Sequence, residues 1–346
     1  MRWHEGHSRV RYPLRVPHAR VIPVVACLLA LAACGSPSAT PSPTVSATPS
    51  TSATPTASAT PTASVKPQTS LTGITVKGDF GKKPTVTVKA PFGIDKTRSK
   101  VLVQGSGYKA SGDGIVTVNY YGVNGRTGKM FEESFSGKTP ATFSLAQVIT
   151  GFKEGLTGQR AGSRVLIAMP GKDAYDASPD NGPEGYQVGD TLIFVVDIIS
   201  VSVTQPDGKV IAPPAGLPKV SGSAADKPAV TIPSGSAPSK MSVAVLIQGT
   251  GPKVAKTDTI TARYVGYSWK TGKLIDDGFA TPTSGKVSGL IPGWQAGLVG
   301  QRVGSRVLLV LPPADGFPNG SNNPPVEKGD TVVYVVDVLF AAAGAE

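Results

Sequence analysis

A block of 23 residues that occurs twice is the strongest constraint on how this chain can fold. Residues 148–170 read VITGFKEGLTGQRAGSRVLIAMP, and residues 290–312 read LIPGWQAGLVGQRVGSRVLLVLP. In the first copy Phe152 and Leu156 are four residues apart, so they share one face of a helix. Glycines then precede an apolar run, a pattern that predicts a turn leading into a strand. Each copy therefore sets one short apolar helix against a sheet.

The repetition extends well beyond this block. VLVQGSG begins at residue 101 and returns 144 residues later as VLIQGTG, and Tyr120 returns as Tyr264 with the same displacement. The apolar segment GDTLIFVVDII at 189–199 returns 140 residues later as GDTVVYVVDVL. A period of this length indicates two globular domains rather than a solenoid, whose repeats run about 20 to 50 residues. Each unit is long enough, at roughly 100 residues, to bury its own core.

The order of predicted elements within a unit indicates the fold class. The alternating segment IVTVNYYG at 115–122 predicts a strand, and the helix of the repeated block follows it. After the block come a polar loop at 171–190 and a last strand, TLIFVVDIISV. Strands, one short helix and further strands predict an antiparallel sheet with a helix on one face, which is an α+β fold.

The start of the chain has the pattern of an export signal. Several arginines precede the apolar run at 21–33, which is too short to span a bilayer as a helix of about 20 apolar residues. The run ends in LAACG, which resembles a bacterial lipobox. Residues 1–33 are therefore predicted to be a lipoprotein signal peptide, with Cys34 acylated and anchored at the outer face of the cell membrane. An ordinary cleaved signal, or a membrane anchor with an incidental cysteine, is the alternative.

The composition of the remainder of the chain predicts a stalk, two domains and a linker between them. Residues 34–70 are almost entirely Ser, Thr, Pro and Ala, and have too few large apolar residues to fold, so they are predicted to form a disordered stalk. The first domain is predicted at 71–204, with an N-terminal strand extension. A linker rich in Pro, Gly, Ser and Ala is predicted at 205–240, and the second domain at 241–346.

The positions of histidine and cysteine exclude several kinds of enzyme. All three histidines and Cys27 lie within the predicted signal, which leaves Cys34 as the one cysteine after it. A histidine-dependent hydrolytic triad, a Cys–His dyad, a zinc site with histidine ligands and an intrachain disulfide are thereby excluded. No metal or cofactor is predicted. The net charge of +11 is spread among acidic residues, and export separates the chain from nucleic acid, so no nucleic-acid partner is predicted.

Five motifs together carry a family resemblance. VNYYG, TGKMFEES, QVITGFKEGL, KDAYD and TLIFVVDI resemble, in order and spacing, motifs of the FKBP family of peptidyl-prolyl cis-trans isomerases. The fold of that family wraps an antiparallel sheet around one short helix, so the resemblance implies two FKBP-like domains. It also implies an isomerase that acts on X-Pro bonds, here in exported or cell-envelope proteins, without a cofactor. Binding of Pro-containing client segments and of a macrolide inhibitor is implied as well.

The resemblance assigns a set of pocket residues in the first domain. Glu132 stands where the family has aspartate, and Phe152 stands where many members have tryptophan. Taken alone, Tyr120, Val148 and Phe194 would be interpreted as core residues, whereas Tyr175 lies in a polar loop where no core residue is required. The residues implied to be catalytic are Tyr120, Phe131, Glu132, Val148, Ile149, Phe152, Tyr175 and Phe194.

The second copy retains a less complete set. Ile275 replaces the phenylalanine of the turn, and Phe317 lies near the position of the loop tyrosine but has no hydroxyl. The second domain is therefore predicted to be the weaker catalyst. A non-catalytic chaperone or interaction module that binds Pro-containing segments is the alternative for one or both pockets. The second pocket is implied to consist of Tyr264, Ile275, Asp276, Leu290, Ile291, Trp294 and Tyr334.

One further alternative concerns the acidic residues of the first polar loop. Asp173, Asp176, Asp180 and Glu184 do not have the spacing of an Asp-x-Asp-x-Asp-Gly calcium loop. A solvated loop is therefore the preferred interpretation.

Overall fold

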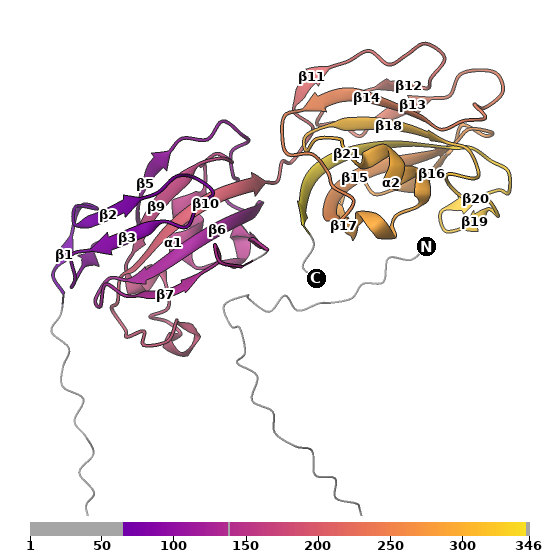
Figure 1. Ribbon diagram of the computed structural model, residues 1–346. Coiled ribbons are helices and arrows are strands. Elements are labelled where there is room, and N and C mark those ends of the chain that lie inside the picture. The colour runs from indigo at the N-terminus through magenta and orange to yellow at the C-terminus, as the bar shows by residue number, and fades with distance from the viewer. Residues whose placement is uncertain (1–64, 138, 344–346) are drawn as a thin grey trace, which may run out of the picture. The chain divides into compact units, whose positions relative to one another are not determined.

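A computed structural model describes residues 65–137 and 139–343 (Figure 1). The predicted signal peptide, Cys34 and the stalk up to residue 64 lie outside the described residues. Within the described part of the chain, none of the helices combines the length and the apolar character that a membrane crossing requires.

The first sheet has six strands in the order β5-β9-β10-β6-β7, and β8 also pairs with β6. All of its pairings are antiparallel. Every residue of β9 is buried, because its RVLIAM sequence is covered on both faces of the sheet. The strands are β5 (Arg98–Val103), β6 (Ile115–Asn124), β7 (Met130–Glu133), β8 (Ala141–Ser144), β9 (Arg164–Met169) and β10 (Leu192–Val201).

The short helix α1 (Thr150–Leu156) lies very close to this sheet. A Cβ added to Gly155 would lie 2.6 Å from Cδ1 of Ile167 on β9, a separation that real Cβ atoms do not show. Glycine on the inner side of α1 therefore permits the close approach, and Phe152 and Leu156 on the same side are buried. The short helix η1 (Leu145–Gln147) leads into α1, and η2 (Gly171–Asp173) and η3 (Pro179–Asn181) lie in the loop after β9.

The second sheet repeats this plan and adds one strand. Its order is β11-β14-β18-β21-β15-β16, and β17 pairs with β15. Helix α2 (Pro292–Leu298), preceded by η4 (Val287–Gly289), takes the place of α1 (Figure 1). The strands are β11 (Gly208–Val210), β14 (Ser242–Gly249), β15 (Asp258–Ser268), β16 (Leu274–Asp277), β17 (Thr283–Lys286), β18 (Arg306–Leu311) and β21 (Val332–Ala343).

A β-hairpin covers the face of each sheet opposite the helix. In the first domain β2 (Ile74–Lys77) and β3 (Thr85–Val88) pack their apolar side chains on a cluster that includes Leu166 and Ile193. In the second domain β12 (Lys219–Ser221) and β13 (Ala229–Thr231) pack similarly. Residues 205–240, whose composition predicted a linker, thus contain β11, β12 and β13. Smaller pairings join β1 (Pro67–Gln68) to β4 (Gly93–Ile94) and β19 (Ser321–Asn322) to β20 (Pro325–Val326).

Each hairpin is attached to its sheet by a buried arginine. Arg164 forms a bidentate ion pair with Asp197, with Nε 2.6 Å from Oδ1 and Nη2 2.8 Å from Oδ2. Both side chains are 1 % exposed. The same guanidinium donates to the carbonyls of Gly78 and Lys82 in the turn between β2 and β3, at 2.6 Å each. The remaining donors of a buried guanidinium need acceptors, and the hairpin turn supplies them.

Arg306 and Asp337 form the equivalent pair in the second domain, at 2.6 and 2.9 Å. Arg306 donates to the carbonyls of Ser223, Ala224 and Asp226 in the turn between β12 and β13. The hairpin and its attachment are therefore part of the repeated unit. The predicted α+β fold, with one short helix on an antiparallel sheet in each copy, is confirmed.

Candidate functional site

The structure brings the predicted apolar residues of the first pocket together in one cluster. Phe194 on β10 lies at its centre. Its ring centroid is 4.6 Å from that of Phe152 on α1 and 5.5 Å from that of Phe131 on β7, with the rings edge to face in both pairs. The cluster contains Tyr120, Phe152, Tyr175 and Phe194 as buried residues and Phe131, Val148 and Ile149 as partly buried ones.

The Tyr-x-Gly motif on β6 has a direct role in shaping this cluster. Gly122 pairs with Phe194 on one side and with Glu132 on the other. A Cβ on Gly122 would lie 2.5 Å from Cζ of Phe131 and 3.1 Å from Cε1 of Phe194. The missing side chain thus lets these two aromatic rings meet above the strand.

Tyr120 and Glu132 form the polar side of the first pocket. Burial raises the pKa of the Tyr120 hydroxyl, and the nearby Glu132 carboxylate, which accepts its hydrogen bond, raises it further. Burial likewise raises the pKa of Glu132, while the hydrogen bond from Tyr120 opposes this shift. The two groups therefore influence each other's pKa, as neighbours in one pocket do. Tyr120 is a neutral hydrogen-bond donor across the ordinary pH range.

Ile149 offers a backbone donor at the rim of the pocket. It is the N-cap of α1, and its carbonyl accepts the N–H groups of Phe152 and Lys153, at 3.0 and 3.2 Å. Within residues 65–137 and 139–343 its own N–H has no acceptor. An unpaired N–H beside an apolar pocket can bind the carbonyl of a ligand.

Tyr175 lies in the flap loop, residues 171–191, between β9 and β10. The residue is 9 % exposed, and its ring packs edge to face against Tyr186, with 5.9 Å between centroids. Burial, and secondarily the charge of Glu132, raises the pKa of Tyr175 to about 12, so its hydroxyl remains protonated. Tyr175 therefore combines a buried ring with a hydroxyl that can donate a hydrogen bond.

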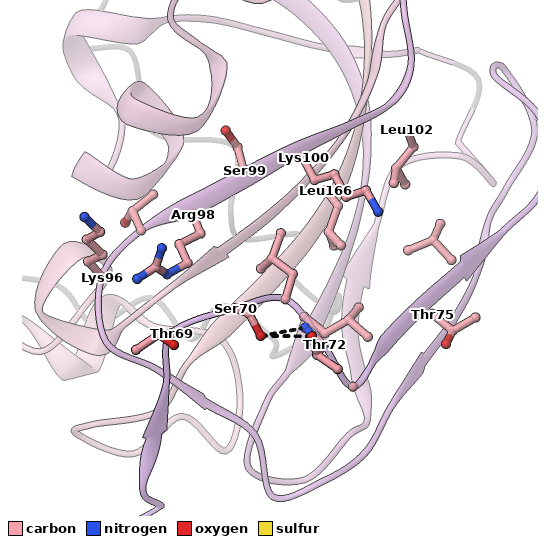
Figure 2. Close-up of a pocket in the computed structure, with 15 residues that line it drawn as sticks. Thr69, Ser70, Thr72, Thr75, Lys96, Arg98, Ser99, Lys100, Leu102 and Leu166 are labelled. Atoms are coloured by element: carbon pink, nitrogen blue, oxygen red, sulfur yellow. Dashed lines mark hydrogen bonds between the residues drawn. The ribbon is translucent and has the colours of Figure 1, made fainter.

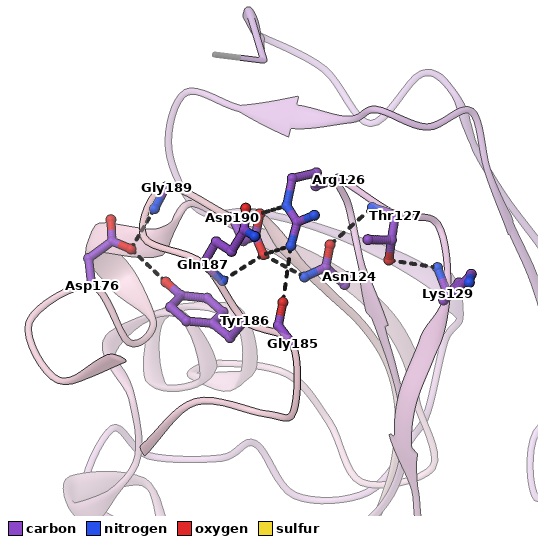
Figure 3. A network of polar contacts seen from close by, with 10 residues as sticks. All are labelled: Asn124, Arg126, Thr127, Lys129, Asp176, Gly185, Tyr186, Gln187, Gly189 and Asp190. Atoms are coloured by element: carbon purple, nitrogen blue, oxygen red, sulfur yellow. Dashed lines mark hydrogen bonds and ion pairs between the residues drawn. The ribbon is translucent and has the colours of Figure 1, made fainter. Parts of the chain in front are cut away.

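Two carboxylates hold the flap loop in place (Figure 3). Asp176 accepts hydrogen bonds from the Tyr186 hydroxyl at 2.6 Å and from the Gly189 N–H at 2.8 Å. Asp190 accepts from Asn124 at the end of β6 at 2.7 Å and forms an ion pair with Arg126, also at 2.7 Å. The loop is therefore fixed both internally and to the sheet.

Two of the four acidic residues that a calcium loop would have used are engaged in hydrogen bonds within the protein. Asp173 accepts a hydrogen bond from Thr97 at 2.8 Å, and Asp176 is occupied by Tyr186 and Gly189. In the described part of the chain, no three acidic, histidine or cysteine residues are grouped so that they could hold a metal ion.

Two aromatic residues of the first site were not predicted from the sequence. Tyr186 packs on Tyr175, and Phe143 on β8 lies edge to face with Phe152, with 6.0 Å between centroids. Tyr186 could have been found by the argument that identified Tyr175, because it too is an aromatic residue in a polar loop. Phe143 stands in the short segment ATFS and gave no comparable signal.

The second pocket is built on the same framework but has different polar contacts. Tyr264, Trp294 and Tyr334 form three edge-to-face pairs, with centroids 5.0, 5.2 and 6.1 Å apart. The Tyr334 hydroxyl donates to Asp276 at 3.1 Å, and burial raises the pKa of Asp276. Burial, together with the charge of Asp276, raises the pKa of Tyr264 to about 12. Ile275, Leu290 and Ile291 are partly buried against this core, as is Phe317.

The indole of Trp294 has no polar partner among the described residues. Its Nε1 atom is buried and lacks a hydrogen bond within the described residues. The loop from 313 to 331 contains no tyrosine, and Phe317 and the buried Val326 lie there instead. The second pocket therefore keeps the aromatic floor and lacks the hydroxyl that Tyr175 gives to the first.

Comparison with known families agrees with this geometry. The family model described as FKBP-type peptidyl-prolyl cis-trans isomerase matches residues 107–199 and again residues 251–339. The two segments cover more than half of the chain. The chain belongs to this family. Both the tandem FKBP fold and the isomerase activity predicted from the motifs are confirmed.

Individual relatives each match about a third of the chain. A probable FK506-binding protein of Corynebacterium glutamicum is 32% identical over 119 residues, which are 34% of this chain and 99% of that protein. An FK506-binding protein of Streptomyces anulatus is 37% identical over 106 residues, 30% of this chain and 83% of that protein. The outer membrane protein MIP of Legionella longbeachae is 35% identical over 119 residues, but these are only 48% of its length.

Proposed function

We propose that the first domain of this FKBP-type isomerase carries most of its activity, and that its substrates are X-Pro bonds of exported or cell-envelope proteins. In this proposal Phe131, Phe152 and Phe194 surround the proline ring. The Tyr175 hydroxyl and the Ile149 N–H bind substrate carbonyls on either side. The observation that carries the proposal is the contact of the three phenylalanine rings beside an unpaired backbone donor.

Such a pocket needs no nucleophile to accelerate the reaction. Rotation about the X-Pro amide must cross a barrier of about 18 to 20 kcal/mol, because it breaks the resonance of the amide. The planar amide is more polar than the twisted one, so an apolar pocket disfavours the ground state relative to the transition state. Each 1.4 kcal/mol of this difference is about a tenfold gain in rate.

Variants of the full chain test the assignment. Phe152→Ala and Tyr175→Phe should each lower kcat/KM for a Xaa-Pro peptide, the first by removing the pocket floor and the second by removing the hydroxyl. Phe152→Ala should also abolish binding of a macrolide to the first pocket. Trp294→Ala, the matching change in the second domain, should leave most of the activity. If activity survives in both first-domain variants and is lost with Trp294→Ala, the assignment of the catalytic domain is wrong.

The second pocket is proposed to bind Pro-containing segments with little turnover. Two observations support this role: its flap loop has no tyrosine, and the Tyr334 hydroxyl is engaged by Asp276. A chain that carries Phe152→Ala should therefore retain peptide binding while it loses catalysis. Loss of peptide binding in that variant, with Trp294 intact, would argue against a separate binding role.

We also propose that Cys34 is lipidated and anchors the chain at the outer face of the cell membrane. The support for this comes from the sequence LAACG after an apolar run, and from the name of the relative in Legionella longbeachae. Mass spectrometry of the purified chain should find an acylated N-terminal cysteine. Cys34→Ser should release the protein from the membrane fraction, and unchanged sedimentation with the membranes would contradict the anchor.

A further inference from the structure

In the part of the chain that the structure describes, the outer edge of β5 in the first domain is an open strand edge. Among the described residues β5 pairs only with β9, and the nearby β2 pairs only with β3. A groove of about 900 Å³ lies between β5 and β2 (Figure 2). Its walls include residues 69–76 and 96–100, with Leu102 and Leu166 as apolar contacts. The unpaired backbone groups of an edge strand are a template for a further strand.

The second domain shows what the corresponding edge can hold. β14 corresponds to β5 with the displacement of 144 residues seen in VLVQGSG and VLIQGTG. There, β11 pairs antiparallel with β14, so that Lys209 lies opposite Gln248 and Val210 opposite Ile247. The aligned edge in the first domain carries no strand within the described residues. In the second domain β11 thus occupies one end of this edge, at Ile247–Gly249, whereas the aligned residues 103–105 pair with no added strand in the described part of the first domain.

The side chains at the beginning of β5 differ in charge from the aligned side chains of β14. Arg98 and Lys100 pair with Ala168 and Leu166, so they lie on the same outer face as those two residues. The second domain has Ser242 and Ala244 at the aligned positions.

Among the described residues, two of the three cations that line the groove form no ion pair. Arg98 forms an ion pair with Asp95 at 2.9 Å, whereas Lys96 and Lys100 have none in the described part of the chain. Figure 2 shows Lys96, Arg98 and Lys100 following one side of the groove. The open edge is therefore basic at the beginning of β5 and apolar near Leu102.

We propose that this edge binds an extended segment of a partner protein by strand addition. In the register of β11, the segment places an apolar residue opposite Leu102 and acidic residues opposite Lys100 and Arg98. Backbone hydrogen bonds would supply affinity, and alternate side chains on the outer face would supply specificity. A second copy of β5 is a poor occupant because it would bring like charges together. This inference does not rest on the isomerase pocket.

A peptide probe tests the proposal. The peptide GKVIVEVE begins with the residues of β11 and continues with glutamates in the register that faces Lys100 and Arg98. It contains no proline, so it offers no ring to the isomerase pockets. Labelled with a fluorophore, it should bind the full chain, and GKVIVKVK should bind at least tenfold more weakly. The double change Lys96→Glu and Lys100→Glu should weaken binding of GKVIVEVE by tenfold or more.

Lys240→Glu is the matched control, because Lys240 aligns with Lys96 beside the occupied edge. It should change the dissociation constant by less than twofold. Backbone amide shifts on titration should change along β5 and β2. The proposal is overturned if GKVIVEVE does not bind, if the double change leaves its affinity intact, or if the shifts cluster around Phe152 or Trp294 instead.

Discussion

Asp176 accepts a hydrogen bond of 2.6 Å from the Tyr186 hydroxyl, and the ring of Tyr186 packs against Tyr175. Asp176, which follows Tyr175 in the chain, thus binds the hydroxyl of Tyr186, whose ring packs against the ring of Tyr175. Tyr186 is therefore a positioning residue for the flap loop and is not itself assigned a contact with substrate.

Tyr186→Phe should loosen Tyr175 without removing its hydroxyl. A hydrogen bond to a charged group contributes about 1.5 to 3 kcal/mol, of which only part acts on the geometry of the loop. We expect kcat/KM to fall roughly three- to tenfold. Tyr121→Phe is the control, because Tyr121 packs on the opposite face of the sheet. Equal activity of the two variants would show that the Asp176 contact does not position the flap.

Gly155→Ala should destabilise the first domain, although alanine favours helix. The added Cβ would meet Cδ1, Cγ2 and Cγ1 of the fully buried Ile167 at 2.6 to 2.9 Å. Overpacking of this kind costs about 1 to 3 kcal/mol, which exceeds the gain in helix propensity of about 1 kcal/mol. Urea unfolding measures the change. Glu154→Ala, on the exposed side of α1, should have little effect, and a stabilising Gly155→Ala would contradict the close packing.

Arg164→Met should be among the most destabilising single changes. It removes the cation that pairs with the buried Asp197, and among the described residues that carboxylate then keeps only the hydrogen bond from the Gly81 N–H. It also removes the donors to Gly78 and Lys82. Breaking a buried ion pair from one side costs about 3 to 5 kcal/mol, whereas replacing both partners by apolar residues is often far milder. Denaturant unfolding should therefore show the single variant to be less stable than Arg164→Met combined with Asp197→Leu. The reverse order would refute this account of the pair.

The raised pKa of Glu132 makes the free energy of unfolding depend on pH. Burial raises that pKa above 4.5, so the folded state holds the proton more tightly than the unfolded state does. The stabilisation from this group is complete at pH values below the pKa that Glu132 has in the unfolded state. It is lost as the pH rises through the higher pKa that Glu132 has in the folded state. The slope in that window is at most about 1.4 kcal/mol per pH unit. Urea titrations should show that Glu132→Gln removes this decline.

The neighbouring Glu133 provides a control of opposite sign. Burial would raise its pKa, but the hydrogen bonds from Ser136 and the contacts with Lys83 outweigh burial, and the net pKa is lowered. Its stabilisation is present above the unfolded pKa and is lost as the pH falls. Glu133→Gln should therefore flatten the acid side of the stability profile. If the two variants change the profile in the same direction, the environments assigned to these carboxylates are wrong.

The sequence predicted those parts of the site whose residues form local motifs. Phe152 was identifiable because its helical spacing and its repetition as Trp294 mark one apolar face, and the resemblance then placed Tyr120 and Phe194 beside it. The role of Tyr334 was predicted only in part, because its hydroxyl bond to Asp276 joins residues 58 positions apart. Contacts of this kind depend on strand pairing, which single-sequence patterns do not specify.

The attachment of the hairpins to the sheets could not be predicted from the sequence for the same reason. The segments KPTVTV at residues 83–88 and KPAVTI at residues 227–232 have similar sequences and contain β3 and β13. Their position over the outer face depends on Arg164 and Arg306, which lie about 80 residues further along the chain. A composition rich in Pro, Gly, Ser and Ala suggested a linker at 205–240, because short strands that pack through a few apolar side chains resemble loops in composition.

The arginine-bound hairpins also determine where the protein can be cut. The matched family segments begin at residues 107 and 251, downstream of β5 and β14 as well as of both hairpins. In a fragment that begins at residue 107, β5 would be absent and the fully buried β9 would become an unpaired edge strand. The Arg164 guanidinium would also lose its carbonyl acceptors in the hairpin turn. Such a fragment would be prone to aggregate through the uncovered strand. The smallest piece expected to remain soluble therefore starts upstream of residue 74 for the first half and upstream of residue 208 for the second.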